Sequence, residues 1–357
     1  MANPTDSSPP DSLCVVRLSA IGDTCHTLPV LRTLKAAWPE TPITWVIGRT
    51  EAALMADIGD FEFITFDKSA GLGGFRALRR RMAGRRYDAL LMMHASLRAN
   101  AVSRLIPAAR RIGFDRPRAR DFQWLVSDER IPHRARQHAM DALFGFAEYL
   151  GVGDRHLRWD IPVPEADEAF AAQHMEAGRT WLLLSPCSSQ RARNYRNWSV
   201  ANYARIVDYV AERHGVATVI TGGPTALERE YGAAIGEAAR HRPFDLTGRT
   251  TLKQLYALIR RAAVVLCPDS GPAHMATAAA TPVIGLYATS NPDRTGPYLS
   301  RHLVVNAYPE AVRQEFGKAV EDIAWGRRVR DPTAMGLIRP EAVEARLDEV
   351  FGAAAGS

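Results

Sequence analysis

The chain has 357 residues and a formal net charge of +6, and its composition is 46% hydrophobic and 24% charged. At roughly 150 residues per domain, this length predicts two domains, each able to bury its own core. The composition is that of an ordinary soluble protein, and no apolar run reaches the roughly 18 residues that a membrane-spanning helix needs.

Residues 1–11 are polar and are expected to form a disordered tail and not a signal peptide. Apolar, β-branched runs then alternate with helical patterns. The alternation predicts strands at 12–18, 43–48, 61–67, 87–94 and 110–114, and helices at 24–37, 51–58, 74–85 and 97–106. Repeated βα units imply a parallel sheet with helices on both faces. A long helix within 136–152 follows, and the stretch 158–170 is expected to connect two domains.

The second half repeats the alternation. It predicts strands at 180–186, 217–223, 244–248, 263–271 and 282–288, and helices at 199–214, 226–239, 252–261, 272–280 and 340–351. The prediction is therefore an α/β chain of two Rossmann-like, doubly wound domains, 12–165 and 166–335, with a final helix and tail over 336–357. Such domains are expected to face a central cleft at the carboxyl ends of their strands, where these sheets bind ligands.

Positive charge is concentrated in one segment. Residues 76–120 hold thirteen arginines against two aspartates, a local charge of +11 that leaves the remainder of the chain at −5. This polarity indicates an anionic partner. Most of these arginines are expected on solvated helix faces. Arg98, Arg118 and Arg120 are different because they follow the ends of predicted strands.

The turn "SAIGDT" after the first strand contains Asp23. One interpretation is structural: Gly22 permits the turn, and Asp23 caps the next helix. The other is that Asp23 is a general base, kept ionised by the helix N-terminus. Both roles can hold together. The turn lacks a G-x-G-x-x-G fingerprint, which argues against a dinucleotide-dependent dehydrogenase.

Three loops of the second half could contact a ligand. In "SPCSSQRARNYRNW", two hydroxyls and several arginines suit a phosphate, although a solvated basic loop is the alternative. In "TGGPTALERE", Glu228 either belongs to a tight turn or binds a ribose. In "CPDSGPAHMATAAATPVIGLY", the helix after Ser270 has free amides in its first turn, and His274 lies in that turn.

Taken together, "LSAIGDTCHTLP" and "CPDSGPAHMATAAATPVIGLYATSNPDRTGPY" resemble the ADP-heptose:lipopolysaccharide heptosyltransferases of glycosyltransferase family 9. The resemblance covers nearly the whole folded chain. It implies the GT-B fold, with the acceptor on the N-terminal domain and the nucleotide sugar on the C-terminal one. It also implies an inverting, metal-independent transfer of heptose from ADP-L-glycero-D-manno-heptose to the Kdo/heptose inner core of lipopolysaccharide.

The resemblance assigns roles to particular residues. The family's catalytic aspartate corresponds to Asp23. The family's donor contacts correspond to Asp269, Ser270, Gly271, His274, Ser188 and Ser189. Glu228 corresponds to a ribose contact, although the spacing around it matches the family pattern only loosely. Where family members often have a lysine, this loop has arginines, and either Arg193 or Arg196 takes that place. The arginines and helix amides would stabilise the departing pyrophosphate. Arg98, Arg118 and Arg120 would bind the anionic acceptor.

Some alternatives stay open at this point. The chain could use another nucleotide sugar, as a transferase or an epimerase, or be a non-catalytic carbohydrate-binding relative. The acceptor sugar could be Kdo or a first heptose. No metal, other cofactor or nucleic acid is expected. Four cysteines without close pairs fit a reducing cytoplasm, so the protein is expected there, either free or peripheral on the inner membrane.

Overall fold

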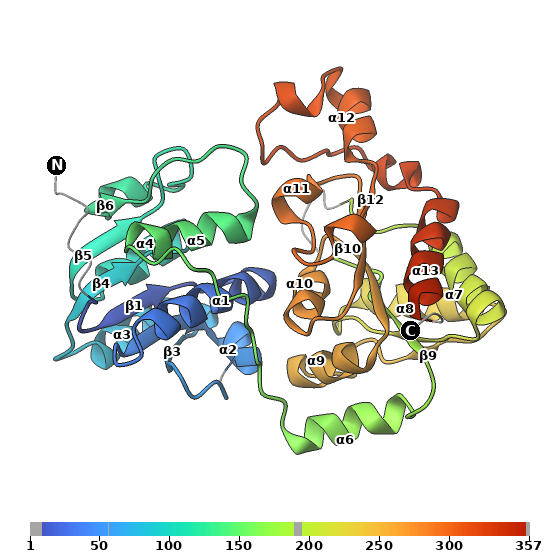
Figure 1. Ribbon diagram of the computed structural model, residues 1–357, viewed down its shortest axis with the longest axis horizontal. Helices are drawn as coiled ribbons and strands as arrows, with labels where there is room; N and C mark the ends of the chain where they lie inside the picture. The colour runs from blue at the N-terminus through green and yellow to red at the C-terminus, as the bar shows by residue number, and fades with distance from the viewer. Residues whose placement is uncertain (1–8, 56, 189–194, 355–357) are drawn as a thin grey trace. The chain divides into compact units, whose positions relative to one another are not determined.

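The computed structural model describes residues 9–55, 57–188 and 195–354. The chain divides into an N-terminal unit, Met1–Pro162, and a C-terminal unit, Val163–Ser357. Each unit is built on one six-stranded sheet, and every pair of neighbouring strands runs parallel (Figure 1). Within the described ranges, no helix combines the length and the apolar character that crossing a membrane requires.

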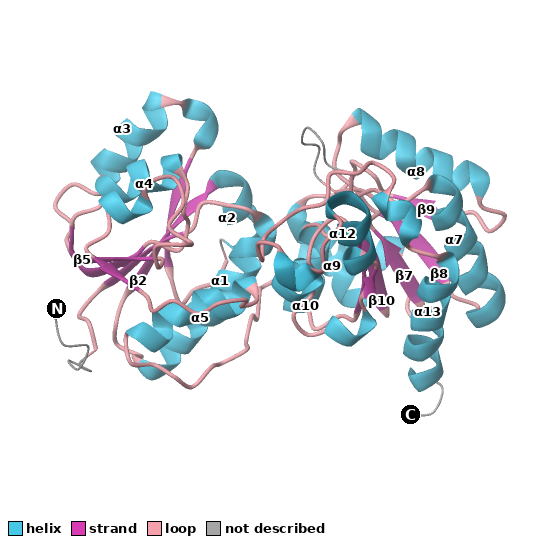
Figure 2. Ribbon diagram, turned by 90° about the horizontal axis from the view of Figure 1, so that it is seen from above, coloured by secondary structure: helices cyan, strands magenta, loops and turns pink. Residues whose placement is uncertain are grey.

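The N-terminal sheet has the strand order β3-β2-β1-β4-β5-β6. Its strands are β1 Leu13–Val16, β2 Ile43–Gly48, β3 Glu62–Phe66, β4 Tyr87–Leu91, β5 Ala108–Gly113 and β6 Glu129–Arg130. Its helices are α1 Ile21–Ala37, α2 Arg49–Met55, α3 Leu72–Arg81, α4 Leu97–Arg104 and α5 Ala139–Tyr149. Figure 2 shows α1 and α5 on one face of the sheet and α3 and α4 on the other. The central strand β1 is accordingly buried along its whole length.

The C-terminal sheet has the order β12-β11-β10-β7-β8-β9, so its strands follow the same chain order as those of the first sheet. They are β7 Trp181–Leu184, β8 Ala217–Ile220, β9 Phe244–Asp245, β10 Val264–Pro268, β11 Val283–Tyr287 and β12 Val305–Asn306. The helices are α6 Glu165–His174, α7 Val200–His214, α8 Ala226–Ala238, α9 Leu252–Arg261, α10 Gly271–Ala278, α11 Pro292–Thr295, α12 Tyr308–Phe316 and α13 Pro340–Ala354. Short 3-10 helices lie at Lys68–Ala70, Gln123–Leu125, Arg301–Leu303, Val320–Asp322 and Ala334–Leu337.

The predicted α/β class with two Rossmann-like sheets is confirmed. The predicted helices and strands are present, with ends that shift by a few residues. Helix α1 begins at Ile21 and not at residue 24, which brings Asp23 into its first turn. The stretch expected as a plain connection contains the start of α6, whose first turn is acidic, as helix N-termini favour. Helix α13 packs Val343 and Leu347 into the core of the C-terminal unit.

The turn after β1 lies against the end of β2. The amide of Gly48 donates to the carbonyl of Leu18 at 3.1 Å. A Cβ atom on Gly48 would lie 2.2 Å from that carbonyl oxygen and 2.3 Å from Oε2 of Glu51. Because one of the two crowded atoms is backbone, a side chain at Gly48 would displace the turn that leads to Asp23.

We therefore expect Gly48→Ala to lower the free energy of unfolding of the N-terminal unit by about 1–3 kcal/mol, the usual cost of overpacking. Chemical denaturation measures this change. Gly59→Ala is the matched control, because a Cβ there meets nothing within 4 Å. Equal stability of the two variants would contradict the close packing described here.

Candidate functional site

Each sheet reverses its strand order once, between β1 and β4 in the N-terminal unit and between β7 and β10 in the C-terminal unit. In open α/β sheets, ligands bind at the carboxyl ends of the strands beside such a reversal. Most of the residues predicted from sequence follow these four strands, whereas Arg118 and Arg120 follow β5 and Glu228 follows β8. Asp23 follows β1, Arg98 follows β4, Ser188 follows β7, and Asp269 follows β10.

Asp23 lies in the first turn of α1, where its side chain caps the helix and stays accessible. Its Oδ2 atom accepts a hydrogen bond from the amide of Ala20 at 3.1 Å, so the carboxylate caps the helix. The same oxygen pairs with Nη2 of Arg17. The Asp23 side chain is nevertheless 39% exposed, whereas that of Arg17 is 11% exposed. The carboxylate is thus held in one orientation and remains accessible to a substrate.

His94 was not singled out from the sequence, although a polar residue three positions after the end of β4 was a usable signal. Its Nδ1 atom accepts a hydrogen bond from the amide of Leu18 at 3.3 Å, so its proton resides on Nε2. Burial, followed by the positive charge of Arg17, lowers the pKa of His94 from 6.5 to about 4. The imidazole is therefore neutral at pH 7. It supplies an N–H donor without adding charge beside Asp23.

The arginines predicted to bind the acceptor differ in their surroundings. Arg98 is exposed in the first turn of α4, and its charge helps to lower the pKa of His94, which places it at the same edge of the sheet. Arg120 is also exposed. Arg118 instead pairs with buried Asp115 and donates to Gln137 at 3.0 Å and to the Pro132 carbonyl at 3.2 Å. Arg118 thus has contacts within its own unit, and its binding of the acceptor stays a prediction, as it does for Arg98 and Arg120.

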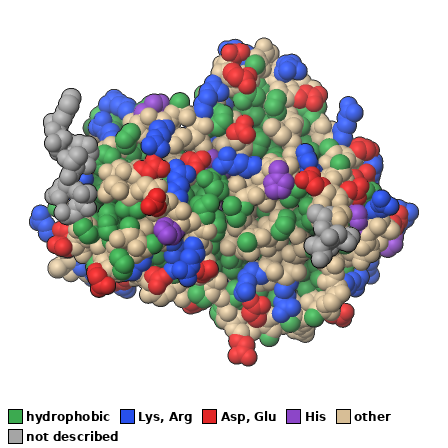
Figure 3. Space-filling view, viewed as in Figure 1, with side chains coloured by type: hydrophobic (Ala, Val, Ile, Leu, Met, Phe, Trp, Pro, Cys, Tyr) green, Lys and Arg blue, Asp and Glu red, His purple; other side chains and the backbone are tan. Residues whose placement is uncertain are grey.

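Other arginines of 76–120 bind carboxylates of the same unit. Arg85 pairs with Glu62 at 2.6 Å, and Arg110 pairs with Glu129 at 2.7 Å. On the face shown in Figure 3, basic and acidic side chains are mixed and form no single-sign surface. The excess of arginine in this segment is therefore used in part for ion pairs within the unit, which were not predicted from the sequence.

In the C-terminal unit, the buried carboxylate of Asp269 joins three loops. Its Oδ2 atom accepts a hydrogen bond from the hydroxyl of Ser290 at 2.7 Å and pairs with Nη1 of Arg196 at 3.3 Å. The same Arg196 nitrogen donates to the Asp269 carbonyl at 2.7 Å. The side chains of Asp269 and Arg196 are only 9% and 13% exposed. Arg196 therefore bridges the strand-order reversal, from the loop after β7 to the loop after β10.

The other residues predicted to bind the donor differ in their surroundings. Ser188 is buried, and its amide donates to Oδ1 of Asn197 at 3.0 Å. Ser270 is the N-cap of α10, and its buried Oγ atom has no hydrogen-bond partner among the residues that the structure describes. Gly271 begins that helix, and His274 is buried in its first turn. Ser189 and Arg193 lie outside the described residues, so Arg196 is the arginine of this loop that the structure connects to Asp269.

Glu228 turns toward its own loop. Its carboxylate accepts hydrogen bonds from the amide of Gly223 at 2.8 Å and from the hydroxyl of Thr225 at 2.6 Å. A Cβ atom on Gly223 would lie 2.8 Å from that carboxylate, which explains the glycine. Glu228 thus closes the Gly-Gly turn in this structure, and its contact with a ribose stays a prediction.

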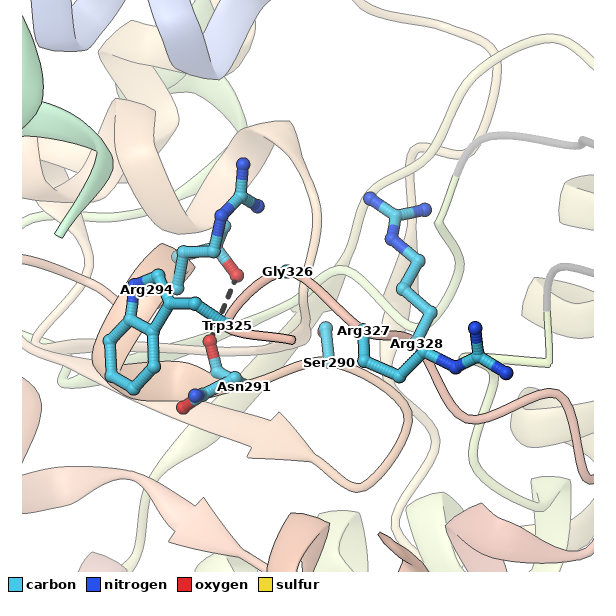
Figure 4. A pocket seen from close by; sticks show the side chains of 8 residues that line it. Ser290, Asn291, Arg294, Trp325, Gly326, Arg327 and Arg328 are labelled. Atoms are coloured by element: carbon cyan, nitrogen blue, oxygen red, sulfur yellow. Dashed lines mark hydrogen bonds between the residues drawn. The ribbon is translucent and has the colours of Figure 1, made fainter. Parts of the chain in front are cut away.

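In the described parts of the chain, no group of three or more His, Cys, Asp or Glu side chains is arranged to hold a metal ion. A small pocket beside Asp269 is lined by residues after β11 and by residues 325–328, with Arg294 on one side and Arg327 and Arg328 on the other (Figure 4). Arg294 belongs to the motif "NPDRTGPY", but no role was assigned to it from the sequence. Arg327 and Arg328 were not singled out because they lie about 30 residues beyond that motif in the chain.

The lowered pKa of His94 predicts a loss of stability in acid. Unfolding restores the ordinary pKa of 6.5, so the unfolded state takes up a proton first. The folded state therefore keeps its full free energy of unfolding, as far as His94 is concerned, above pH 6.5 and loses part of it as the pH falls toward 4. At pH 4.5 the protonation of this one histidine lowers the free energy of unfolding by about 2–3 kcal/mol.

We expect His94→Asn to remove much of this acid sensitivity in denaturant unfolding at pH 7.5 and 4.5, because the variant has no imidazole to protonate. His302→Asn, at an exposed histidine, should keep the wild-type profile. An unchanged profile for His94→Asn would show that other groups cause the loss.

The chain is similar to a known protein family and to individual members of it. Residues 75–322 match the family model described as glycosyltransferase family 9 (heptosyltransferase). The lipopolysaccharide core heptosyltransferase OpsX of Haemophilus influenzae is 37% identical over 347 residues, which cover 97% of this chain and 99% of that protein. Lipopolysaccharide heptosyltransferase 3 of Escherichia coli K12 is 22% identical over 76% of this chain and 80% of that protein.

Solved structures share the fold across both units. A glycosyltransferase family 9 protein from Veillonella parvula superposes with a TM-score of 0.79 at 23% identity, covering 96% of this chain and 97% of that one. The E. coli heptosyltransferase WaaC with ADP gives a TM-score of 0.73 at 17% identity, over 95% of this chain and 99% of that one. The two sheets, the family match and the extent of the likeness to OpsX together show that the chain belongs to glycosyltransferase family 9, the heptosyltransferases.

Proposed function

We propose that this protein transfers heptose from ADP-heptose to the Kdo/heptose inner core of lipopolysaccharide, with inversion at the anomeric carbon. The likeness to OpsX, a lipopolysaccharide core heptosyltransferase 37% identical to this chain, supports the substrate class. One structural observation supports the proposed reaction mechanism. An accessible carboxylate, Asp23, lies at the strand-order reversal of one sheet, and a buried Asp269–Arg196 pair lies at that of the other.

In this reaction, Asp23 accepts the proton of the attacking acceptor hydroxyl, whose oxygen forms the new bond to the anomeric carbon. The bond from that carbon to the β-phosphate oxygen breaks, and its electron pair leaves with ADP. Arg196 and the first amides of α10 would stabilise the charge that grows on the leaving diphosphate. The proposal needs no metal ion for this step, because fixed guanidinium and amide donors supply the positive potential.

The direct test is turnover with defined substrates. Purified protein is incubated with ADP-heptose and either a Kdo-bearing lipid A or an acceptor that already carries one heptose, in buffer with EDTA. Mass spectrometry then measures whether the acceptor gains one heptose. Transfer to either acceptor supports the proposal and identifies the acceptor sugar. Transfer from UDP- or GDP-sugars alone, or a strict need for added metal, would contradict it.

Removal of the base should affect the chemical step. We expect Asp23→Asn to lower kcat by about 10²–10⁴-fold, the usual contribution of a general base. The ADP affinity measured by calorimetry should change by no more than a few-fold. The asparagine oxygen can still accept from the Ala20 amide, so the helix cap is retained. A variant that keeps most of its kcat would remove Asp23 from the mechanism.

The exposed arginines should act on the acceptor. Carboxylates and phosphates of an anionic acceptor suit planar guanidinium groups. We therefore expect Arg98→Ala and Arg120→Ala to raise the KM for the acceptor, more strongly at low salt, and to leave ADP affinity unchanged. Arg79→Ala, at an exposed arginine in the last turn of α3, is the control. If Arg98→Ala and Arg120→Ala weaken ADP binding instead, the substrates are assigned to the wrong units.

A further inference from the structure

The segment 324–329 carries a positioned arginine to the carboxyl edge of the C-terminal sheet. The hydroxyl of Tyr308, in α12, donates to the carbonyl of Arg327 at 2.6 Å. The amide of Val329 donates to the carbonyl of Thr289 at 3.0 Å, and the Val329 side chain is buried in the core. The residues on both sides of Arg328 are thus attached to the unit, one to α12 and one to the end of β11.

Arg328 lies in a positively charged environment. Burial, followed by repulsion from Arg196, lowers its pKa to about 10. Arg294 adds to this repulsion, and Asp269 is the carboxylate that opposes it. Asp269 already accepts from Ser290 and pairs with Arg196. A guanidinium held partly out of water beside other guanidinium groups is costly unless an anion compensates it.

The adjacent pocket offers further hydrogen-bond donors. It is formed by four residues of the stretch 290–295 and by residues 325–328 (Figure 4). The Asn291 side chain is only 4% exposed, and its Oδ1 atom is occupied by the amide of Asp293 at 3.0 Å. Its Nδ2 atom has no partner within the part of the chain that the structure describes. A buried amide donor beside arginines suits an oxyanion.

We propose that Arg328 binds the diphosphate of the nucleotide donor together with Arg196, with Asn291 as a neutral donor to the same group. The inference rests on the proposed function and adds to it a residue from a segment about 60 positions beyond Asp269 in the chain. A guanidinium can bind two phosphate oxygens at once, and its charge would stabilise ADP as the leaving group. The attachments on both sides of Arg328 pre-organise this contact.

The test distinguishes a contact with the diphosphate from a contact with the nucleoside. Calorimetry measures the Kd of wild type and Arg328→Gln for ADP, AMP and adenosine. We expect the variant to raise the Kd for ADP by about 10- to 100-fold, because a charge-assisted hydrogen bond is lost. The Kd for adenosine should not change. Arg313→Gln, at an exposed arginine of α12, is the matched control and should bind ADP like wild type.

Arg328→Lys provides a second variant should Arg328→Gln fail to fold. It keeps the charge but loses the planar fork, so ADP affinity should fall by a smaller factor, again without an effect on adenosine. Equal losses for ADP and adenosine, or an unchanged ADP affinity, would overturn the inference.

GDP and UDP are measured alongside ADP. If wild type prefers one of these, the proposed donor is wrong. The Kd of Arg328→Gln for the preferred nucleoside diphosphate then tests the Arg328 contact. If wild type binds none of the three, the inference is overturned. If Arg328→Gln binds ADP like wild type, the inference fails and the proposed function stands.

Discussion

The C-terminal unit depends on one buried carboxylate. Asp269 holds the ends of β7, β10 and β11 together through Arg196 and Ser290, so that their loops keep a common geometry. A carboxylate buried this deeply is stable only while its partners remain, since breaking one partner of a buried pair leaves an uncompensated charge. The arrangement thus stabilises the loops. It also gathers guanidinium groups where a strand-order reversal makes room for a ligand.

Both units contain an aspartate–arginine pair, but the two pairs expose different groups. Each has an aspartate and an arginine at the reversal of its sheet. In the N-terminal unit the arginine, Arg17, is the buried member and the aspartate, Asp23, is accessible. In the C-terminal unit both members are largely buried, and Arg328 lies near enough to be influenced by both. The first arrangement presents an oriented carboxylate and the second a cationic site, which are the two parts that a metal-independent sugar transfer from a nucleotide donor requires.

The α/β class and the positions of the main helices and strands could be predicted, because apolar β-branched strands alternate with amphipathic helices. Strands β6 and β12, of two residues each, were not predicted, although the equally short β9 lies inside a predicted strand. The turn after β1 was recognisable from Gly22 and Asp23, but the pairing of Asp23 with Arg17 depends on side-chain directions that spacing does not determine. Arg328 could not be predicted, since only the folded chain brings it to Asp269. The pairing of Arg118 with Asp115 likewise could not be predicted from its position after a strand, and its predicted contact with the acceptor is not tested by this ion pair.

The central claim is that the cationic edge around Asp269 binds the diphosphate of an ADP-linked sugar. A crystal structure of the protein with ADP tests it most directly. The account predicts that the diphosphate lies at the start of α10, with its oxygens within hydrogen-bond distance of Arg196 and Arg328 and with no metal ion between them. A diphosphate bound away from both arginines, or one held to the protein through a metal ion, would contradict the account.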